Sequence, residues 1–215
     1  MNLATFRAAV PTDGAVQVPA SASRAHDLEL AQRAASGDRS AQRAVFLAHR
    51  ANVHRVLFRI LGSNRELEDL LQDSFIEIFR ALPSFRGDST LGRWCQTIAT
   101  RIAYLSISRR RPPTVDLALV EDAVAGGADV LRHIQVREAA VRLYAALARI
   151  EPKQRVAFAL AVIDGKSLSE VAALTESSVF AVKTRVWRAR RDLMQRARKD
   201  AVLAAYLQEL QGGES

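Results

Sequence analysis

Apolar residues recur at every third or fourth position from Asp27 to Arg111, a spacing that places them on one face of an α-helix. Strand-like alternation of apolar and polar residues does not persist in this stretch. Turn-forming residues gather at 36–38, 62–64 and 83–89, and these breaks divide the stretch into about four helices. The first part of the chain is therefore expected to be a helical domain.

The helical pattern ends at Arg111 because two prolines follow it, and proline lacks the amide hydrogen that a continuing helix needs. Residues 112–130 contain acids and glycines but no basic residue, a composition typical of a flexible tether. Helical periodicity resumes near Leu131, with turns at 150–152 and 164–166. We predict an all-α fold of two small helical domains, divided into a disordered tail at 1–24, a first domain at 25–111, a flexible acidic linker at 112–130, a second domain at 131–200 and a C-terminal tail at 201–215.

Residues 167–191 predict two helices separated by a short turn. Ser167 and Glu170 have the spacing of a capping box, which starts the first helix. Ser177 or Ser178 can cap the second helix after the turn. The apolar stripe that this second helix is expected to bury consists of Val179, Val182, Val186 and Leu193. Two such helices make a helix-turn-helix unit, whose second helix enters the major groove of DNA.

The charge of the chain makes a polyanion the first partner to consider, since its formal net charge is +8. Basic residues cluster at 101–111 and 183–199. The outer face of the second helix of the helix-turn-helix unit is expected to carry Phe180, Lys183, Thr184, Trp187, Arg188 and Arg191. A solvated basic helix is the plain alternative, but the capped helix before it and an exposed Trp187 favour DNA.

The helix expected at 67–82 has two distinct faces. Its apolar face comprises Leu67, Leu70, Leu71, Ser74, Phe75, Ile78, Phe79 and Leu82, which are expected to be buried. Its other face is acidic but includes Ile76, and an apolar anchor within a charged surround is typical of protein docking. A single exposed isoleucine is also common on surfaces, so this pattern alone does not decide.

The helix expected at 90–108 is predicted to bury Leu91, Cys95, Ile98, Ile102 and Leu105. Its other face would then expose Arg93, Thr97, Thr100, Arg101, Tyr104 and Ser108, which suit unstacked bases and a single-strand backbone. The loop at 84–89 precedes this helix and carries one aromatic residue, Phe85, that we expect to be exposed.

These motifs resemble a known family, the extracytoplasmic-function sigma factors of bacterial RNA polymerase. Asp-Leu-Leu-Gln-Asp-Ser-Phe at 69–75, the loop at 84–89, Trp94 and Ile98-Ala99 resemble region 2 of that family. The segments 164–172 and 182–190 resemble region 4. The resemblance covers about residues 27 to 195 in order and spacing.

The resemblance implies a DNA-reading initiation subunit that binds core RNA polymerase, through its beta-prime clamp helices and beta flap, and promoter DNA. The residues that it assigns to core polymerase are Asp69, Gln72, Asp73, Ile76 and Glu77. Those that it assigns to the minus-10 element, where a base is flipped out, are Ala81, Phe85, Arg86, Asp88, Ser89, Trp94, Thr97, Arg101 and Tyr104. Those that it assigns to the minus-35 element are Phe180, Lys183, Thr184, Arg185, Trp187, Arg188, Arg190 and Arg191. It also implies control by an anti-sigma factor.

Two other classes of function explain less of the sequence. A helix-turn-helix regulator with a helical sensor domain would explain the second half of the chain, but not the acidic docking helix or the Phe85 loop. A helical enzyme would need a catalytic or metal constellation, and the four histidines are scattered without ligand spacing. We therefore expect no catalytic residue, metal or cofactor.

Cellular location follows from the cysteine content and the longest apolar run. Cys95 is the single cysteine, so it has no partner for an internal disulfide and is expected in a reduced core. The apolar run from Val156 to Ile163 is too short to cross a bilayer. We expect a cytoplasmic protein without a membrane segment. The resemblance further implies that it is bound to the nucleoid when active or held at the membrane by an anti-sigma factor.

Overall fold

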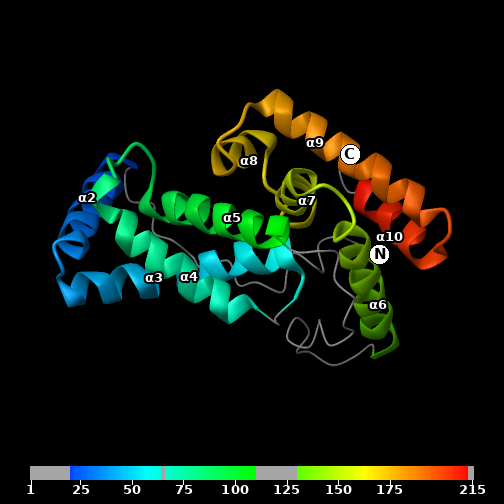
Figure 1. The fold of residues 1–215 in the computed structure, drawn as a ribbon, viewed down its shortest axis with the longest axis horizontal. Helices are drawn as coiled ribbons and strands as arrows, with labels where there is room; N and C mark the ends of the chain where they lie inside the picture. Colours follow the sequence, from blue (N-terminus) through cyan, green and yellow to red (C-terminus); the bar gives the residue numbers. More distant parts are fainter. Residues whose placement is uncertain (1–19, 64–65, 110–129, 213–215) are drawn as a thin grey trace.

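The computed structural model describes residues 20–63, 66–109 and 130–212, and these residues form helices without strands (Figure 1). The predicted all-α fold is therefore confirmed for the part of the chain that is described. Residues 1–19 of the expected tail and residues 112–129 of the expected linker lie outside the described residues.

The first half contains the helices expected there. They are α2 (Ala20–Ala35), α3 (Arg39–Leu61), α4 (Leu67–Ala81) and α5 (Leu91–Arg109), with a short 3₁₀ turn, η1 (Leu82–Ser84), after α4. Helix α3 begins where the Asp38 carboxylate accepts the backbone N–H groups of Ser40 and Ala41. It ends at Gly62, whose φ of 70° lies in the left-handed region that glycine adopts without strain. Helix α2 already begins at Ala20, inside the segment expected to be a disordered tail.

The buried face of α5 differs from the expected one. Leu91 and Cys95 are buried as predicted, but Leu105 is exposed and Thr100, expected on the outer face, is buried. Small side chains such as Ala99 take the interior positions instead. The reason is that α5 packs on two sides, against α3 and against the second half of the chain. A prediction that assumes one buried face therefore assigns the residues at the border of that face incorrectly.

The second half is also helical. It consists of α6 (Val130–Leu147), α7 (Pro152–Phe158), a π-helical turn η2 (Ala159–Ile163), α8 (Leu168–Leu174), α9 (Val179–Ala197) and α10 (Ala201–Gly212). The expectation of a C-terminal tail from 201 was wrong, because α10 packs on α6 and α9 and buries Leu203 and Leu207. Asp200 starts this helix by accepting the N–H of Leu203 at 3.1 Å.

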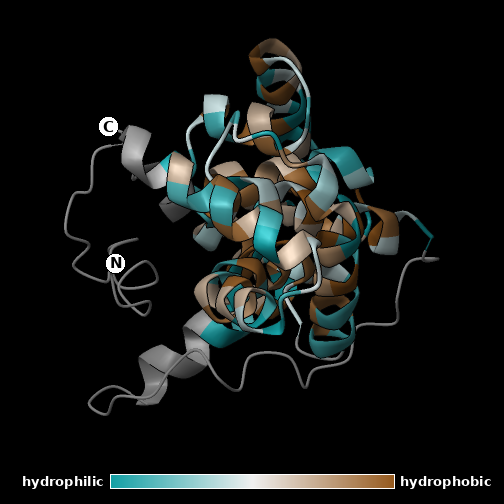
Figure 2. Cartoon of the chain, turned by 90° about the vertical axis from the view of Figure 1, so that its left-hand side faces the viewer, coloured by the Kyte–Doolittle hydropathy of each residue, from teal (hydrophilic) through white to brown (hydrophobic). Residues whose placement is uncertain are grey.

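The two halves pack against one another. Helix α5 contacts α7 and α8, and α3 contacts η2. The hydrophobic segments gather where the helices face each other, as the brown parts of Figure 2 show. One buried core therefore runs through both halves.

Polar contacts at the end of α3 hold the two halves together. The buried Arg155 guanidinium donates to the carbonyl oxygens of Ile60 at 3.1 Å and Leu61 at 2.9 Å. The Tyr144 hydroxyl donates to the carbonyl oxygen of Arg59 at 2.9 Å. The last carbonyls of a helix have no partner within it, so these side chains satisfy groups that burial would otherwise leave unpaired. We call these contacts, together with Asp164 beside Arg59, the interdomain contacts; the Asp164–Arg59 ion pair measures 3.7 Å.

Candidate nucleic-acid and polymerase interfaces

The predicted helix-turn-helix unit is present as α8 and α9. The Ser167 hydroxyl accepts the N–H of Glu170 at 3.2 Å, and the Glu170 carboxylate accepts the N–H of Ser167 at 2.9 Å. This reciprocal capping box confirms the predicted start of α8. The Ser167 hydroxyl also donates to the Glu170 carboxylate at 2.7 Å, and this hydrogen bond, together with the one from the Ser167 N–H, lowers the pKa of the Glu170 carboxyl. The turn places Glu176 at a φ of 47°, and Ser178 then caps α9 by accepting the N–H of Ala181.

Helix α9 buries most of the predicted stripe. Val182, Val186 and Leu193 are buried, with Ala189 between them. The prediction was wrong for Val179, which is 47% exposed. Val179 is the first residue of α9 and directly follows the turn, so no earlier turn of the same helix covers its side chain.

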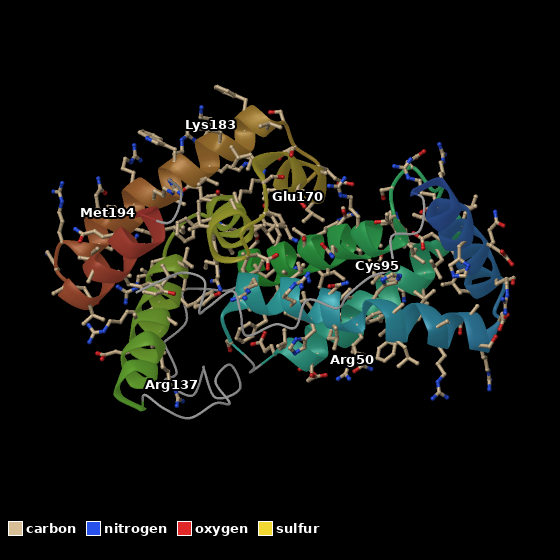
Figure 3. The ribbon with its side chains drawn as sticks, turned by 180° about the vertical axis from the view of Figure 1, so that it is seen from behind. Arg50, Cys95, Arg137, Glu170, Lys183 and Met194 are labelled. Carbon is tan, nitrogen blue, oxygen red and sulfur yellow. The ribbon has the colours of Figure 1, made fainter. Side chains whose placement is uncertain are left out.

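The outer face of α9 presents aromatic and basic side chains to solvent. Phe180 is 80% exposed and Trp187 is 59% exposed. Lys183, labelled in Figure 3, and Arg188 are exposed as well. The Arg191 guanidinium lies 5.3 Å from the centre of the Trp187 ring, in cation–π contact.

Three of the residues assigned to the minus-35 element are less exposed. Thr184 is half-buried, and its hydroxyl donates to the carbonyl oxygen of Phe180 at 3.0 Å. Arg185 donates to the Ser177 hydroxyl oxygen at 3.1 Å and so lies toward the turn. Arg190 is also half-buried. The exposed face is thus narrower than the sequence alone suggested.

The acidic face of α4 is exposed as predicted. Asp69, Gln72, Asp73 and Glu77 are exposed, and Ile76 among them is 45% exposed. The opposite face buries Phe75 and most of the other apolar side chains, but Phe79, which was expected to be buried, is half-buried. The Ser74 hydroxyl donates to the carbonyl oxygen of Leu70. A single apolar side chain therefore stands out from an acidic helix surface.

The loop between η1 and α5 corrects the prediction for Phe85. We expected this ring to be exposed, but it is 7% exposed and packs against Trp94, with the ring centres 5.3 Å apart. Helix α2 lies over this region, where Leu28 approaches Gly87. The sequence could not show this cover because α2 is more than fifty residues earlier in the chain.

The other residues assigned to the minus-10 element surround this aromatic pair. Arg86 and Asp88 are exposed, whereas Ala81 and Ser89 are half-buried. On α5, Arg101 is exposed, and the half-buried residues are Trp94, Thr97 and Tyr104. The expected cationic and hydroxyl-bearing face is therefore present, but without Thr100, whose hydroxyl donates to the carbonyl oxygen of Gln96 at 2.8 Å.

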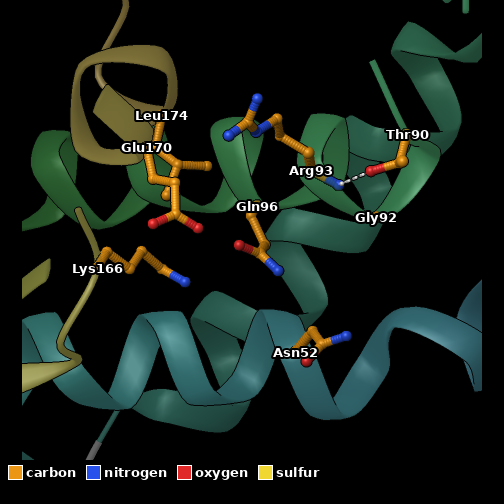
Figure 4. A pocket seen from close by; sticks show the side chains of 8 residues that line it. All are labelled: Asn52, Thr90, Gly92, Arg93, Gln96, Lys166, Glu170 and Leu174. Atoms are coloured by element: carbon orange, nitrogen blue, oxygen red, sulfur yellow. Dashed lines mark hydrogen bonds between the residues drawn. The ribbon is translucent and has the colours of Figure 1, made fainter. Parts of the chain in front are cut away.

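A polar cavity of about 280 Å³ lies between α3, α5 and α8 (Figure 4). Its lining residues are Asn52, Thr90, Gly92, Arg93, Gln96, Lys166, Glu170 and Leu174. Sequence reasoning missed this cavity and the interdomain contacts, because both exist only where the two halves meet. Arg155, for example, has no sequence feature that distinguishes it from a surface arginine.

Among the described residues, no group of histidine, cysteine and carboxylate side chains could hold a metal ion. None of the described helices is long and apolar enough to cross a membrane.

Comparisons with known proteins match both halves. Residues 45–112 match Sigma-70 region 2, and residues 140–193 match Sigma-70, region 4. The ECF RNA polymerase sigma-E factor of Escherichia coli is 32% identical over 177 residues, which cover 76% of this chain and 90% of that protein. The RNA polymerase sigma-H factor of Pseudomonas aeruginosa is 28% identical over 173 residues, with the same coverage of 76% and 90%. The structure of CnrH in complex with the cytosolic domain of CnrY is similar with a TM-score of 0.55 at 25% identity, covering 81% of this chain and 98% of that one.

Proposed function

Because this chain belongs to the extracytoplasmic-function sigma factors, which direct promoter-specific initiation by RNA polymerase, we propose how its surfaces divide that task. The first half binds core polymerase through α4 and the minus-10 element through α5 and the loop before it. The second half reads the minus-35 element through α9. The observation that carries this assignment is the exposed aromatic and basic outer face of α9 on an intact helix-turn-helix unit.

The minus-35 contacts are proposed on charge and geometry. Lys183 and Arg188 lie on the outer face of α9, where a major-groove helix meets base edges and phosphates. An arginine that bonds both acceptors of a guanine contributes about 1–3 kcal/mol of discrimination. Arg191 is oriented by Trp187 and is suited to a phosphate. Arg185 and Arg190 are proposed for phosphates at the edge of the contact, since both are half-buried.

The polymerase contact is proposed for the acidic face of α4. Ile76 supplies an apolar anchor, and exposed carboxylates such as Asp69 and Asp73 surround it. The beta-prime clamp helices are the partner that the family assigns to this helix. Charged groups around an apolar anchor set orientation and association rate more than affinity.

The minus-10 contact is proposed for the surroundings of the Phe85–Trp94 pair. Because Phe85 is buried, we propose that the pair forms the floor of a base pocket rather than an exposed stacking surface. Arg86, exposed beside it, and Arg101 on α5 would contact the unpaired strand. Extrusion of a base costs a few kcal/mol, which contacts in such a pocket must offset.

An anti-sigma factor is the proposed protein regulator. CnrH, which is similar over 81% of this chain, has been solved in complex with the cytosolic domain of CnrY. We propose that a protein partner of this chain likewise covers surfaces needed for polymerase or DNA, and that the chain acts in the cytoplasm. Its test is whether a protein partner found by co-purification blocks initiation when added to the reconstituted polymerase.

The experiment that tests the proposed function is run-off transcription from a promoter selected by the holoenzyme out of a randomised duplex library. Core polymerase with the wild-type chain should give specific transcripts, and Ile76→Glu and Arg188→Ala should each lower the yield at least tenfold, which corresponds to about 1.4 kcal/mol. Leu47→Ala serves as a control, because Leu47 is 63% exposed but lies outside these surfaces.

A chain that leaves core polymerase unchanged but binds duplex DNA by itself would contradict the proposal. It would instead support a helix-turn-helix regulator. Loss of polymerase binding in Ile76→Glu, with duplex binding retained by the second half, would separate the two surfaces.

A further inference from the structure

The most exposed large hydrophobic side chain of the described residues is Phe180, which is 80% exposed. It is the second residue of α9, directly after the Ser178 cap and Val179. Val179 and Trp187 of the same helix are also exposed large hydrophobic residues, and a grouping of this kind on one helix indicates a contact surface more strongly than a single exposed ring would.

The neighbours of Phe180 along the outer face of α9 are two cationic side chains and a tryptophan. Lys183, Trp187 and Arg191 follow Phe180 at three, seven and eleven residues, so they continue along the same side of the helix. The Trp187 ring is already in contact with the Arg191 guanidinium, whereas the Phe180 ring carries no hydrogen-bonding group of its own. A partner of this surface must therefore be anionic overall and offer an apolar contact near the start of α9.

Duplex DNA meets both requirements, since its phosphates are anionic and its major groove carries an apolar group. The base edges in the major groove present donors and acceptors, and the apolar group among them is the C5-methyl of thymine. The N-terminal residues of a recognition helix are those that contact base edges. We propose that Phe180 contacts a thymine methyl group in the minus-35 duplex and so adds a thymine preference at the base pair nearest the start of α9.

This inference deepens the proposed function and rests on α9 entering the major groove. It goes further in one respect, because it assigns sequence discrimination to a side chain that cannot form a hydrogen bond with a base. Such discrimination depends only on the methyl group, which makes it separable from every polar contact of the same helix.

The test replaces each thymine of the minus-35 region, one at a time, by uracil, which lacks the methyl group but pairs in the same way. Holoenzyme affinity is measured on these duplexes with the wild-type chain and with Phe180→Ala. For the wild type, uracil at one position should weaken binding about fourfold, the equivalent of one methyl-sized apolar contact. Phe180→Ala should bind the thymine and uracil duplexes alike.

The controls separate the side chain from the fold. Val179→Ala changes the neighbouring exposed apolar residue and should keep the thymine preference. Leu47→Ala, on α3, should keep it as well. Circular dichroism of Phe180→Ala should match that of the wild type, since an exposed side chain contributes little to the core.

Three outcomes decide between the alternatives. If the wild type binds thymine and uracil duplexes equally at every position while Arg188→Ala still abolishes initiation, the inference fails and the proposed function stands. If, in addition, Arg188→Ala leaves initiation unchanged, both the inference and the proposed minus-35 role of α9 fail. If Phe180→Ala leaves all DNA affinities unchanged but loses a protein partner, the inference is overturned and Phe180 belongs to a protein-docking surface.

Discussion

The thiol of Cys95 lies in the interior of the first half, where its side chain has no exposed surface. Burial disfavours the charged thiolate and raises the pKa of Cys95 to about 12. The sequence predicted a reduced core residue, and the burial of Cys95 confirms its place in the core. Residues whose role is set by composition and local spacing, such as this one, could be predicted without the fold.

Cys95 should therefore resist thiol reagents in the native protein. At pH 8 about one thiol in ten thousand would be ionised, and the reagent would also need the core to open. We expect negligible reaction with Ellman's reagent without denaturant and one equivalent after unfolding in urea. Cys95→Ala should give no signal in either condition, because the chain has one cysteine. Full reaction of the folded protein within seconds would contradict the burial.

The helices whose ends carry local signals agree with the sequence. The capping box at Ser167, the cap at Ser178 and the turn at Gly62 depend on side chains within a few residues of the helix end. The exposure of Phe85 and the identity of the α5 interior could not be predicted, because they depend on α2 and on the second half. Periodicity finds a helix, but tertiary contacts decide how much of its surface is covered.

The cap of α9 provides a prediction at this scale. Ser178→Ala removes the hydroxyl that accepts the N–H of Ala181 and should lower the free energy of unfolding by about 1 kcal/mol. Ser178→Asp should largely preserve stability, since aspartate caps equally well. Urea denaturation followed by circular dichroism measures both.

The matched control for this cap is Ser108→Ala. The Ser108 hydroxyl donates to the Tyr104 carbonyl oxygen within α5 and caps no helix. Its substitution should change the free energy of unfolding by less than about 0.5 kcal/mol, as is usual at exposed sites. Equal losses in the two variants would contradict the special role of the cap.

At the scale of the whole molecule, the packed halves conflict with simultaneous reading of both promoter elements. Positions minus-10 and minus-35 lie about 85 Å apart along DNA at 3.4 Å per base pair. In the packed arrangement α5 contacts α8 and α8 contacts α9, so α5 and α9 are separated by about two helix diameters, roughly 20 Å. If α5 and α9 read the two elements as proposed, the halves separate on a promoter, and the interdomain contacts oppose that separation.

Among the residues of the interdomain contacts, Arg155 is the one whose substitution should have the largest effect on the packing of the two halves. Arg155→Met retains much of the apolar stem but leaves the carbonyl oxygens of Ile60 and Leu61 without this donor. An unpaired buried polar group costs about 1–3 kcal/mol, and separation of the halves would return both carbonyls to water. We expect a larger radius of gyration in small-angle X-ray scattering. Arg149→Met, at an exposed position of the same half, should leave the radius of gyration unchanged. If Arg155→Met also speeds open-complex formation with core polymerase, then opening of the interdomain contacts limits the rate of open-complex formation. An unchanged or smaller radius of gyration would show that other contacts hold the halves together.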